Sequence, residues 1–196
     1  LGLHPWYVRT DYMPRMDELA EAALRGAKAI GECGLDTKIQ EPSLDMQAPF
    51  FERQLIVAKE LDLPVVMHCR GAFNEMLAVL RRIGTPKCGG LIHAFGGNAE
   101  LAEAFMPYGL SFSLGGTLTY RNSAKRTALL QRIYPDHLLL ETDSPDIPPV
   151  EARERPNVPA HIRFNLRAAA EILGAPEEEI AEHTTANAAR LFRLEV

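Results

Sequence analysis

The sequence has few cysteines, and none of them form a pair with metal-site spacing. Cys33, Cys69 and Cys88 are an odd number, and no Cys-x-x-Cys occurs. Disulfide frameworks and structural zinc knuckles both need paired cysteines. Both are therefore excluded, and we expect reduced, mostly buried thiols in a reducing compartment.

Long hydrophobic runs and an excess of positive charge are also missing. No apolar run approaches the roughly 18 residues of a membrane helix, and no basic-then-apolar leader opens the chain. We therefore expect a cytoplasmic protein with no membrane partner and no obligate protein partner. The formal charge of −5 argues against a basic surface that binds nucleic acid non-specifically. It is compatible with a nucleic-acid enzyme, because bound divalent cations and a few local arginines can hold a phosphodiester.

Short apolar runs alternate with longer amphipathic stretches along the chain. The runs are Leu1–Leu3, Ala27–Gly31, Pro64–Met67, Gly89–Ile92, Gly109–Leu114 and Leu138–Leu140. They lack period-2 alternation, which is typical of parallel strands buried on both faces. The stretches between them predict helices near Met16–Arg25, Ala48–Leu61, Phe73–Ile83, Ala99–Tyr108 and Ala124–Tyr134. Helices at Ala160–Leu173, Pro176–His183 and Asn187–Arg193 are expected after the last strand.

This alternation predicts an α/β fold of the (β/α)8 TIM-type barrel. A complete barrel typically needs about 250 residues. Because the chain is shorter and opens within an apolar run, we expect the first two β/α units to be missing. An open doubly wound sheet is disfavoured, since no Gly-x-Gly-x-x-Gly follows the first strand. No composition break divides the chain, which predicts a single domain over residues 1–196.

Ionisable side chains follow most of the predicted strands. They are His4, Glu32, His68, His93 and Asp143. Any one of them alone would more often be a structural residue, but the carboxyl ends of parallel barrel strands lie on one face, where active sites are built. Carboxylates and imidazoles converging there would repel one another or stay unpaired without a cation. Because mixed histidine and carboxylate ligands suit zinc, manganese or a similar ion, the pattern predicts a metal site.

The same positions lie within short motifs. These are Leu3–Pro5 (LHP), Gly31–Asp36 (GECGLD), Pro64–Arg70 (PVVMHCR), His93–Phe95 (HAF), Leu140–Pro145 (LETDSP) and, further along the chain, Asn187–Phe192 (NAARLF). In this order, the motifs resemble those of the TatD family of metal-dependent hydrolases and deoxyribonucleases, within the amidohydrolase-like barrels. The resemblance implies two divalent metal ions, with Glu32 bridging both and His68 and His93 completing the ligands of one. It also implies that Asp143 binds the other ion and orients or deprotonates the attacking water.

The resemblance implies substrate contacts as well. His4 and Arg70 would line the substrate site, with Arg70 as a phosphate ligand. Arg155 and Asn157 would belong to the family's Arg-Asn-x-Pro loop, although Pro156 separates the two here. The family's His-x-His pair, which binds the metal shared with Asp143, occurs nowhere in the sequence. Either the pair belongs to the missing first strand units, or the protein holds one metal well and the other poorly.

Three hypotheses for function follow. The leading one is hydrolysis of DNA phosphodiester bonds by metal-activated water, at the end of a single strand, in the manner of a 3′-end trimming exonuclease. The second keeps the chemistry but changes the bond to an amide or ester, such as an aminoacyl ester, because metal-activated water attacks carbonyls as well. The arginines Arg70, Arg121, Arg153 and Arg155 favour phosphate. The third is a non-catalytic remnant that at most binds a partner. The residues do not distinguish zinc, manganese, magnesium and nickel.

Overall fold

The computed structural model describes residues 1–120, 123–154 and 156–195. The chain divides into two compact units. The first consists of Leu1–His93, Phe105–Leu110 and Leu191–Arg193, and the second of Ala94–Ala104, Ser111–Arg190 and Leu194–Val196. The expectation of a single domain stays a prediction.

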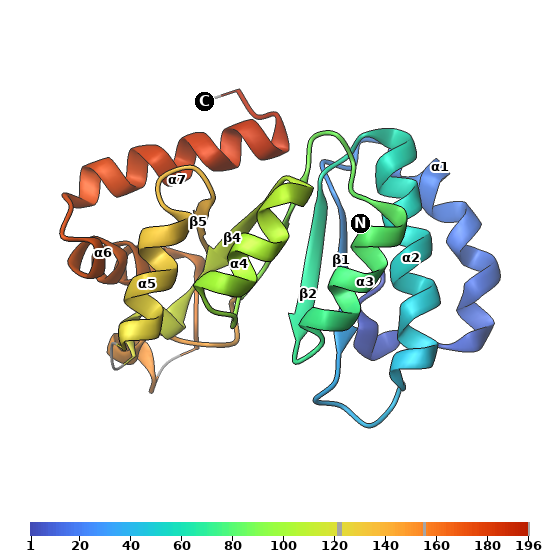
Figure 1. Ribbon diagram of the computed structural model, residues 1–196, viewed down its shortest axis with the longest axis horizontal. Helices are drawn as coiled ribbons and strands as arrows, with labels where there is room; N and C mark the ends of the chain where they lie inside the picture. The colour runs from blue at the N-terminus through green and yellow to red at the C-terminus, as the bar shows by residue number, and fades with distance from the viewer. Residues whose placement is uncertain (121–122, 155, 196) are drawn as a thin grey trace. The chain divides into compact units, whose positions relative to one another are not determined.

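The first unit is built from parallel strands with helices beside them. Its elements are the 3-10 helices η1 (Pro5–Tyr7) and η2 (Thr10–Asp17), the helices α1 (Glu18–Leu24), α2 (Leu44–Leu61) and α3 (Phe73–Ile83), and the strands β1 (Ile30–Asp36), β2 (Val65–Arg70) and β3 (Gly90–Ile92). Strand β1 pairs with β2, and β2 pairs with β3, both in parallel. Helices α2 and α3 lie beside β1 and β2 (Figure 1). This is the β-α-β alternation that the sequence predicts.

Helix α3 illustrates why the sequence folds locally as it does. Its buried residues are Met76, Leu77, Val79 and Leu80, which form one apolar stripe. The helix ends at Gly84, whose φ of 76° is available to glycine without steric cost. The bounds of α3 are the predicted ones, because the stripe and its terminating glycine are both visible in the sequence.

Two glycines bring strand β1 unusually close to strand β2. Gly31 and Gly34 have φ values of 128° and 144°, a region that side chains with a Cβ rarely adopt. A Cβ added at Gly31 would lie 2.2 Å from the carbonyl oxygen of Val66, and one at Gly34 would lie 2.0 Å from that of His68. The two strands can therefore approach as they do only with glycine at these positions, which flank Glu32.

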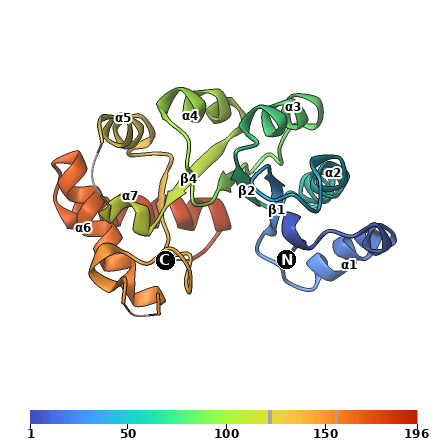
Figure 2. The same ribbon diagram turned by 90° about the horizontal axis from the view of Figure 1, so that it is seen from below.

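The second unit repeats the alternation of strands and helices. Its elements include α4 (Ala99–Phe105), the 3-10 helices η4 (Gly116–Thr119), η5 (Val150–Ala152) and η6 (Pro159–His161), the strands β4 (Leu110–Leu114) and β5 (Leu138–Leu140), and the helices α5 (Ala124–Ile133), α6 (Ile162–Leu173) and α7 (Glu177–Phe192). The 3-10 helix η3 (Met106–Tyr108) follows α4 and belongs to the first unit. The first residues of α4 and the body of β4 belong here, whereas Phe105–Leu110 belongs to the first unit. Strands β4 and β5 pair in parallel, and α6 packs against η4 and α5 (Figure 2).

Some predicted bounds are wrong. The strand predicted at Ala27–Gly31 begins only at Ile30, opposite Val65, and runs on to Asp36. The predicted strand at Leu1–Leu3 is not a strand, although its backbone joins the neighbouring chain through hydrogen bonds from Leu1 N to the Ala29 oxygen and from Gly31 N to the Leu1 oxygen. The end of β1 was placed too early because the polar Glu32 was taken to end an apolar strand.

The end of the chain also differs from the prediction. The two helices predicted at Pro176–His183 and Asn187–Arg193 form one continuous helix, α7. No glycine or proline interrupts it, and the hydroxyl of Thr184 donates to the carbonyl oxygen of Ile180 within the helix. The cysteines are free, as expected, with Cys33 and Cys69 buried. Among the described residues, the helices include none that is long and apolar enough to cross a membrane.

Candidate metal centre

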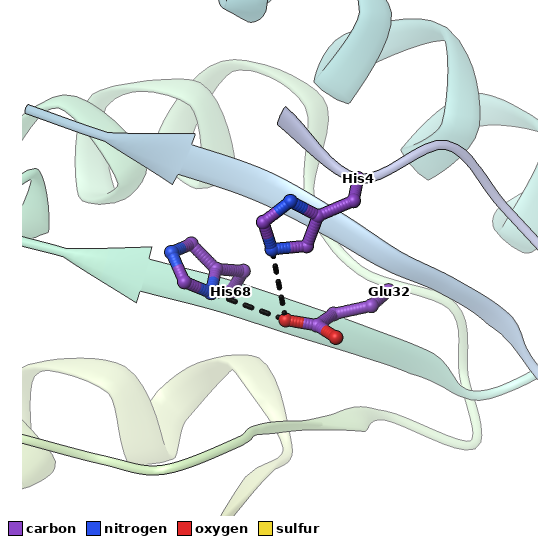
Figure 3. Close-up of side chains that lie close together, drawn as sticks. All are labelled: His4, Glu32 and His68. Carbon is purple, nitrogen blue, oxygen red and sulfur yellow. Dashed lines mark hydrogen bonds and ion pairs between the residues drawn. The ribbon is translucent and has the colours of Figure 1, made fainter. Parts of the chain in front are cut away.

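One carboxylate oxygen in the first unit is approached by three imidazole rings. Oε1 of Glu32 lies 3.2 Å from Nε2 of His4, 3.1 Å from Nδ1 of His68 and 2.7 Å from Nε2 of His93. Nδ1 of His68 and Nε2 of His93 are themselves 3.4 Å apart. Figure 3 shows the rings of His4 and His68 turned toward the Glu32 carboxylate. These residues form the candidate metal centre.

The strands bring these side chains together from distant parts of the sequence. Glu32 lies within β1 and His68 within β2, the neighbouring parallel strand. His93 directly follows β3, and its backbone N–H donates to the carbonyl oxygen of Met67. His4 directly precedes η1. The adjacency of β1, β2 and β3 therefore brings side chains from within or just after three parallel strands to one point.

A buried aspartate holds the far side of the His68 ring. Nε2 of His68 lies 3.0 Å from Oδ2 of Asp36, a residue with no exposed surface. When this nitrogen donates its proton to the carboxylate, the tautomer leaves a lone pair on Nδ1, which faces Glu32. Histidines that bind metals usually donate their second N–H to a carboxylate in this way. The contacts therefore suit His68 as a metal ligand through Nδ1.

Asp36 is held in turn by donors on both of its oxygens. Oδ2 also accepts from the indole N–H of Trp6 at 2.7 Å, and Oδ1 accepts from the backbone N–H of Lys38 at 2.7 Å. Its backbone N–H donates to Oε1 of Gln47, whose Nε2 donates back to the carbonyl oxygen of Asp36. The carboxylate is thus fixed before any ligand binds at the centre.

The hydrogen bonds of His4 indicate a different role from that of His68. Nδ1 of His4 accepts from the backbone N–H of Trp6 at 3.2 Å. A neutral ring that accepts at Nδ1 carries its proton on Nε2, which then donates to Glu32. In this tautomer His4 has no free lone pair for a metal. It is instead a hydrogen-bond donor at the edge of the centre.

The environment favours ionised carboxylates. Burial tends to raise the pKa of Glu32, but the contacts of its carboxylate with the imidazole rings of His4, His68 and His93 outweigh burial and hold the pKa well below its usual range. Burial likewise opposes ionisation of Asp36, and the bonds from Trp6, Lys38 and His68 lower its pKa below the ordinary value. An ionised, oriented donor set is what a cation requires.

The donor set fits a divalent metal ion. Two atoms that each lie about 2.0–2.2 Å from a tetrahedral zinc ion are about 3.3–3.6 Å apart. The separations among Glu32 Oε1, His68 Nδ1 and His93 Nε2 run from 2.7 to 3.4 Å, so small shifts would accommodate an ion. Within the described chain, ligand-type atoms of His4, Glu32 and His68 also lie within 4.8 Å of one another. The His4 tautomer makes His93 the better third ligand.

Comparison with known proteins gives the family. Residues 1–193 match the family described as TatD related DNase. The chain belongs to the TatD family. "Uncharacterized metal-dependent hydrolase YabD" of Bacillus subtilis is 37% identical over 166 residues, covering 85% of this chain and 65% of the relative. "Uncharacterized metal-dependent hydrolase YcfH" of Escherichia coli is 34% identical over 195 residues, with 99% and 73% covered.

Two further TatD proteins widen the comparison. "3'-5' ssDNA/RNA exonuclease TatD" of Erwinia billingiae is 38% identical over 203 residues, with 98% of this chain and 76% of the relative covered. The crystal structure of the TatD homologue YJJV from Escherichia coli has a TM-score of 0.90 at 33% identity, covering 100% of this chain and 76% of that one. The chain thus spans about two thirds to three quarters of the length of these TatD relatives. The expected α/β TIM-type barrel fold is confirmed.

Asp143 and Asn157, expected at the TatD site from sequence, both lie in the second unit. Asp143 has a φ of 55°, and its carbonyl oxygen accepts from the backbone N–H of Asp146. Asn157 is buried, and its Nδ2 donates to the carbonyl oxygens of Thr142 and Asp146 at 2.7 and 2.5 Å. Its side-chain amide therefore ties together the loop that carries Asp143.

Two arginines, Arg70 and Arg155, are expected at the TatD substrate site. Arg70 is exposed at the end of β2, opposite Asp36 in the strand register. It is the last residue of the strand that carries His68. Arg155 lies outside the described residues.

Asp36 and Trp6 were not recognised from sequence as part of the centre. Asp36 closes the Gly31–Asp36 motif, and the spacing of Glu32 and Asp36 by four places them on the same face of a strand. That spacing was an available signal for Asp36. Trp6 gave none, because its contact with Asp36 joins a loop to a strand far along the chain.

Proposed function

We propose that this chain carries the metal centre of a hydrolase that cleaves phosphodiester bonds at the end of a single DNA strand. The observation that carries the proposal is the convergence of His68 and His93 on Oε1 of Glu32, with His68 oriented by Asp36. The chain matches the TatD family, and some members of that family are named 3'-5' ssDNA/RNA exonucleases. This match supports a nucleic-acid substrate.

We assign the ligands as follows. Glu32, His68 and His93 would hold one divalent ion, and Asp143, by its place in the family's motif, would be a ligand of a second. When bound, such ions supply hydroxide near neutral pH and neutralise charge on the phosphate oxygens. Because these 196 residues offer it fewer ligands, the second ion would be held more weakly than the first.

The protein's own groups position the substrate and move protons. Asp143 accepts a proton from the attacking water while the water oxygen forms its bond to phosphorus. In the same step the bond from phosphorus to the leaving oxygen breaks. Arg70 pairs with two phosphate oxygens through its planar guanidinium group. The Nε2–H of His4, which already points into the centre, donates to a phosphate oxygen once the substrate is bound.

An amide or ester substrate is the second candidate. The same donor set would serve a carbonyl, because water activated at a metal attacks carbonyl carbon as readily. The exposed Arg70 beside His68 favours phosphate, since arginine pairs bidentately with phosphate. An aminoacyl ester has only one carbonyl oxygen to polarise and gains less from that guanidinium group.

The proposal is tested by nucleotide release. The chain is loaded in turn with zinc, manganese, magnesium or nickel and incubated with a single-stranded DNA oligonucleotide labelled at its 5′ end, so that shortening from the 3′ end gives a ladder. Glu32→Gln is the matched control, because it keeps the side-chain shape and removes the charge. A chain that releases aminoacyl ester products but no nucleotides with any of these metals would replace the first proposal by the second. Hydrolysis of neither substrate, together with the lack of metal binding in calorimetry, would indicate a non-catalytic remnant.

A further inference from the structure

Two aromatic side chains are exposed next to the metal centre. Trp6 and Tyr7 are 44% and 64% exposed, among the large hydrophobic side chains that the fold leaves in contact with solvent. Both belong to η1, the short helix that begins directly after His4. Aromatic rings of this size are usually buried, so their exposure beside a candidate active site indicates a binding role.

The indole ring of Trp6 is held in one orientation. Its Nε1–H donates to Oδ2 of the buried Asp36 at 2.7 Å. Its ring centroid lies 4.9 Å from that of His4 and 6.0 Å from that of His68, both in edge-to-face geometry. A ring that is fixed before binding loses little conformational entropy when a ligand stacks on it.

The charge of the chain favours a contribution from stacking to the binding of a nucleic-acid substrate. The formal net charge is −5, so a basic groove along the strand cannot supply most of the affinity. Stacking of bases on aromatic rings supplies affinity that depends little on charge and is tolerant of sequence, because every base has a π-face.

We propose that Trp6, with Tyr7 beside it, forms a stacking subsite for a nucleobase of the single strand whose phosphate lies at the metal centre. The inference rests on the proposed function. Trp6 contacts the rings of His4 and His68, so the stacked base belongs to a nucleotide adjoining the bond that is cleaved. The subsite recognises an unpaired base and not a particular sequence.

Trp6 has a second task, which must be separated from stacking. Its N–H holds Asp36, so replacing Trp6 also disturbs the residue behind His68. Trp6→Phe keeps a smaller aromatic face but lacks the N–H, whereas Trp6→Leu removes both the aromatic face and the N–H. If Trp6 acted through Asp36 alone, the two variants would be equally impaired.

Trp6 is the only tryptophan in the sequence, which allows a direct test. The metal-loaded chain is titrated with a single-stranded oligothymidylate whose phosphorothioate linkages resist cleavage, and tryptophan fluorescence is recorded. An abasic oligomer with the same number of phosphates is the ligand control. We expect saturable quenching by the oligothymidylate and little by the abasic oligomer.

Affinities of the variants are measured by anisotropy of a labelled oligothymidylate. We expect Trp6→Leu to bind about tenfold more weakly, Trp6→Phe to lose threefold or less, and Tyr7→Leu to fall between, with magnitudes typical of stacking. Tyr108→Leu is the matched control, because Tyr108 lies just before the amino end of β4 and is not part of the candidate metal centre.

The outcomes separate this inference from the proposed function. Binding and cleavage without quenching, equal quenching by the abasic oligomer, or wild-type affinity in Trp6→Leu would each overturn the stacking subsite alone. No binding of the labelled oligonucleotide and no cleavage would overturn both. Trp6→Phe could also lose as much affinity as Trp6→Leu, and more than Tyr7→Leu. That result would mean that Trp6 acts only by holding Asp36, and it would also overturn the subsite.

Discussion

Nε2 of His68 lies 3.0 Å from the carboxylate of Asp36, which is completely buried and accepts hydrogen bonds on both oxygens. This contact orients the imidazole ring so that Nδ1 faces Glu32. The properties of the centre therefore depend on a residue that does not itself contact the proposed ion.

Asp36→Asn is expected to weaken metal binding by about 10- to 100-fold, the usual effect of losing such a partner. Asparagine has one acceptor oxygen, whereas His68 and Trp6 donate to Oδ2 and the Lys38 N–H donates to Oδ1. In either orientation of the asparagine amide, its NH₂ group would face at least one of these N–H donors, which cannot accept a hydrogen bond. Calorimetric titration with zinc measures the change. Asp45→Asn, the same substitution at an exposed position, is the control and should bind as the wild type. Equal affinity in both variants would rule out the assigned role of Asp36.

Asp143→Asn is expected to lower kcat by about 100-fold or more, because it removes the proposed proton acceptor. The tight metal site should persist, since its ligands are Glu32, His68 and His93. Calorimetry should show the weaker binding event lost and the stronger one kept. Asp146→Asn, an exposed residue in the same loop, should leave both unchanged. Loss of the tight site in Asp143→Asn would contradict the ligand assignment.

Arg70→Ala is expected to raise KM for an oligonucleotide about tenfold, with metal affinity unchanged. The guanidinium group would no longer pair with a phosphate. Arg70→Lys should recover only part of the loss, because an ammonium group cannot make the bidentate contact. Arg81→Ala, at an exposed arginine in the last turn of α3, is the control. A KM in Arg70→Ala equal to that of the control would remove Arg70 from the substrate site.

Tyr134 provides a pH-dependent prediction away from the metal centre. Burial and the hydrogen bond to Glu179 raise its pKa to about 12, from an ordinary value of about 10. A raised pKa in the folded state stabilises the fold below pH about 10, and that stabilisation is lost as pH rises from about 10 to about 12. Glu179→Gln removes the negative partner, so Tyr134 should titrate at lower pH.

The titration can be followed by tyrosinate absorbance. Tyr134→Phe identifies the contribution of this tyrosine among the five in the sequence. Glu178→Gln on the same helix is the control. The prediction fails if the wild type and Glu179→Gln give superimposable curves.

The fold was predictable where apolar patterning is undisturbed. Helix α3 has its predicted bounds because its apolar stripe marks the helix and Gly84 marks the end of the helix. Strand β1 was misplaced because Glu32 and Asp36 are polar residues inside a strand, and polarity normally signals that a buried strand has ended. The residues of the candidate metal centre themselves caused the error, because both carboxylates lie within the strand.

Part of the centre was likewise predictable. Glu32, His68 and His93 were found because each sits at or near the end of an apolar run. The division of roles between His4 and His68 could not be predicted, because it depends on which ring nitrogen contacts Trp6 or Asp36. Such tautomers follow from contacts between residues far apart in the sequence, which spacing does not encode.

The close approach of β1 and β2 at Gly31 and Gly34 has a consequence for how the protein tolerates mutation. Every other amino acid carries a Cβ, and at either position that atom would collide with a main-chain oxygen of β2. A mutational scan scored by metal binding should therefore find these two glycines as intolerant as Glu32, although neither offers a ligand atom. Alanine, the smallest possible change, should already act there as a loss-of-function allele.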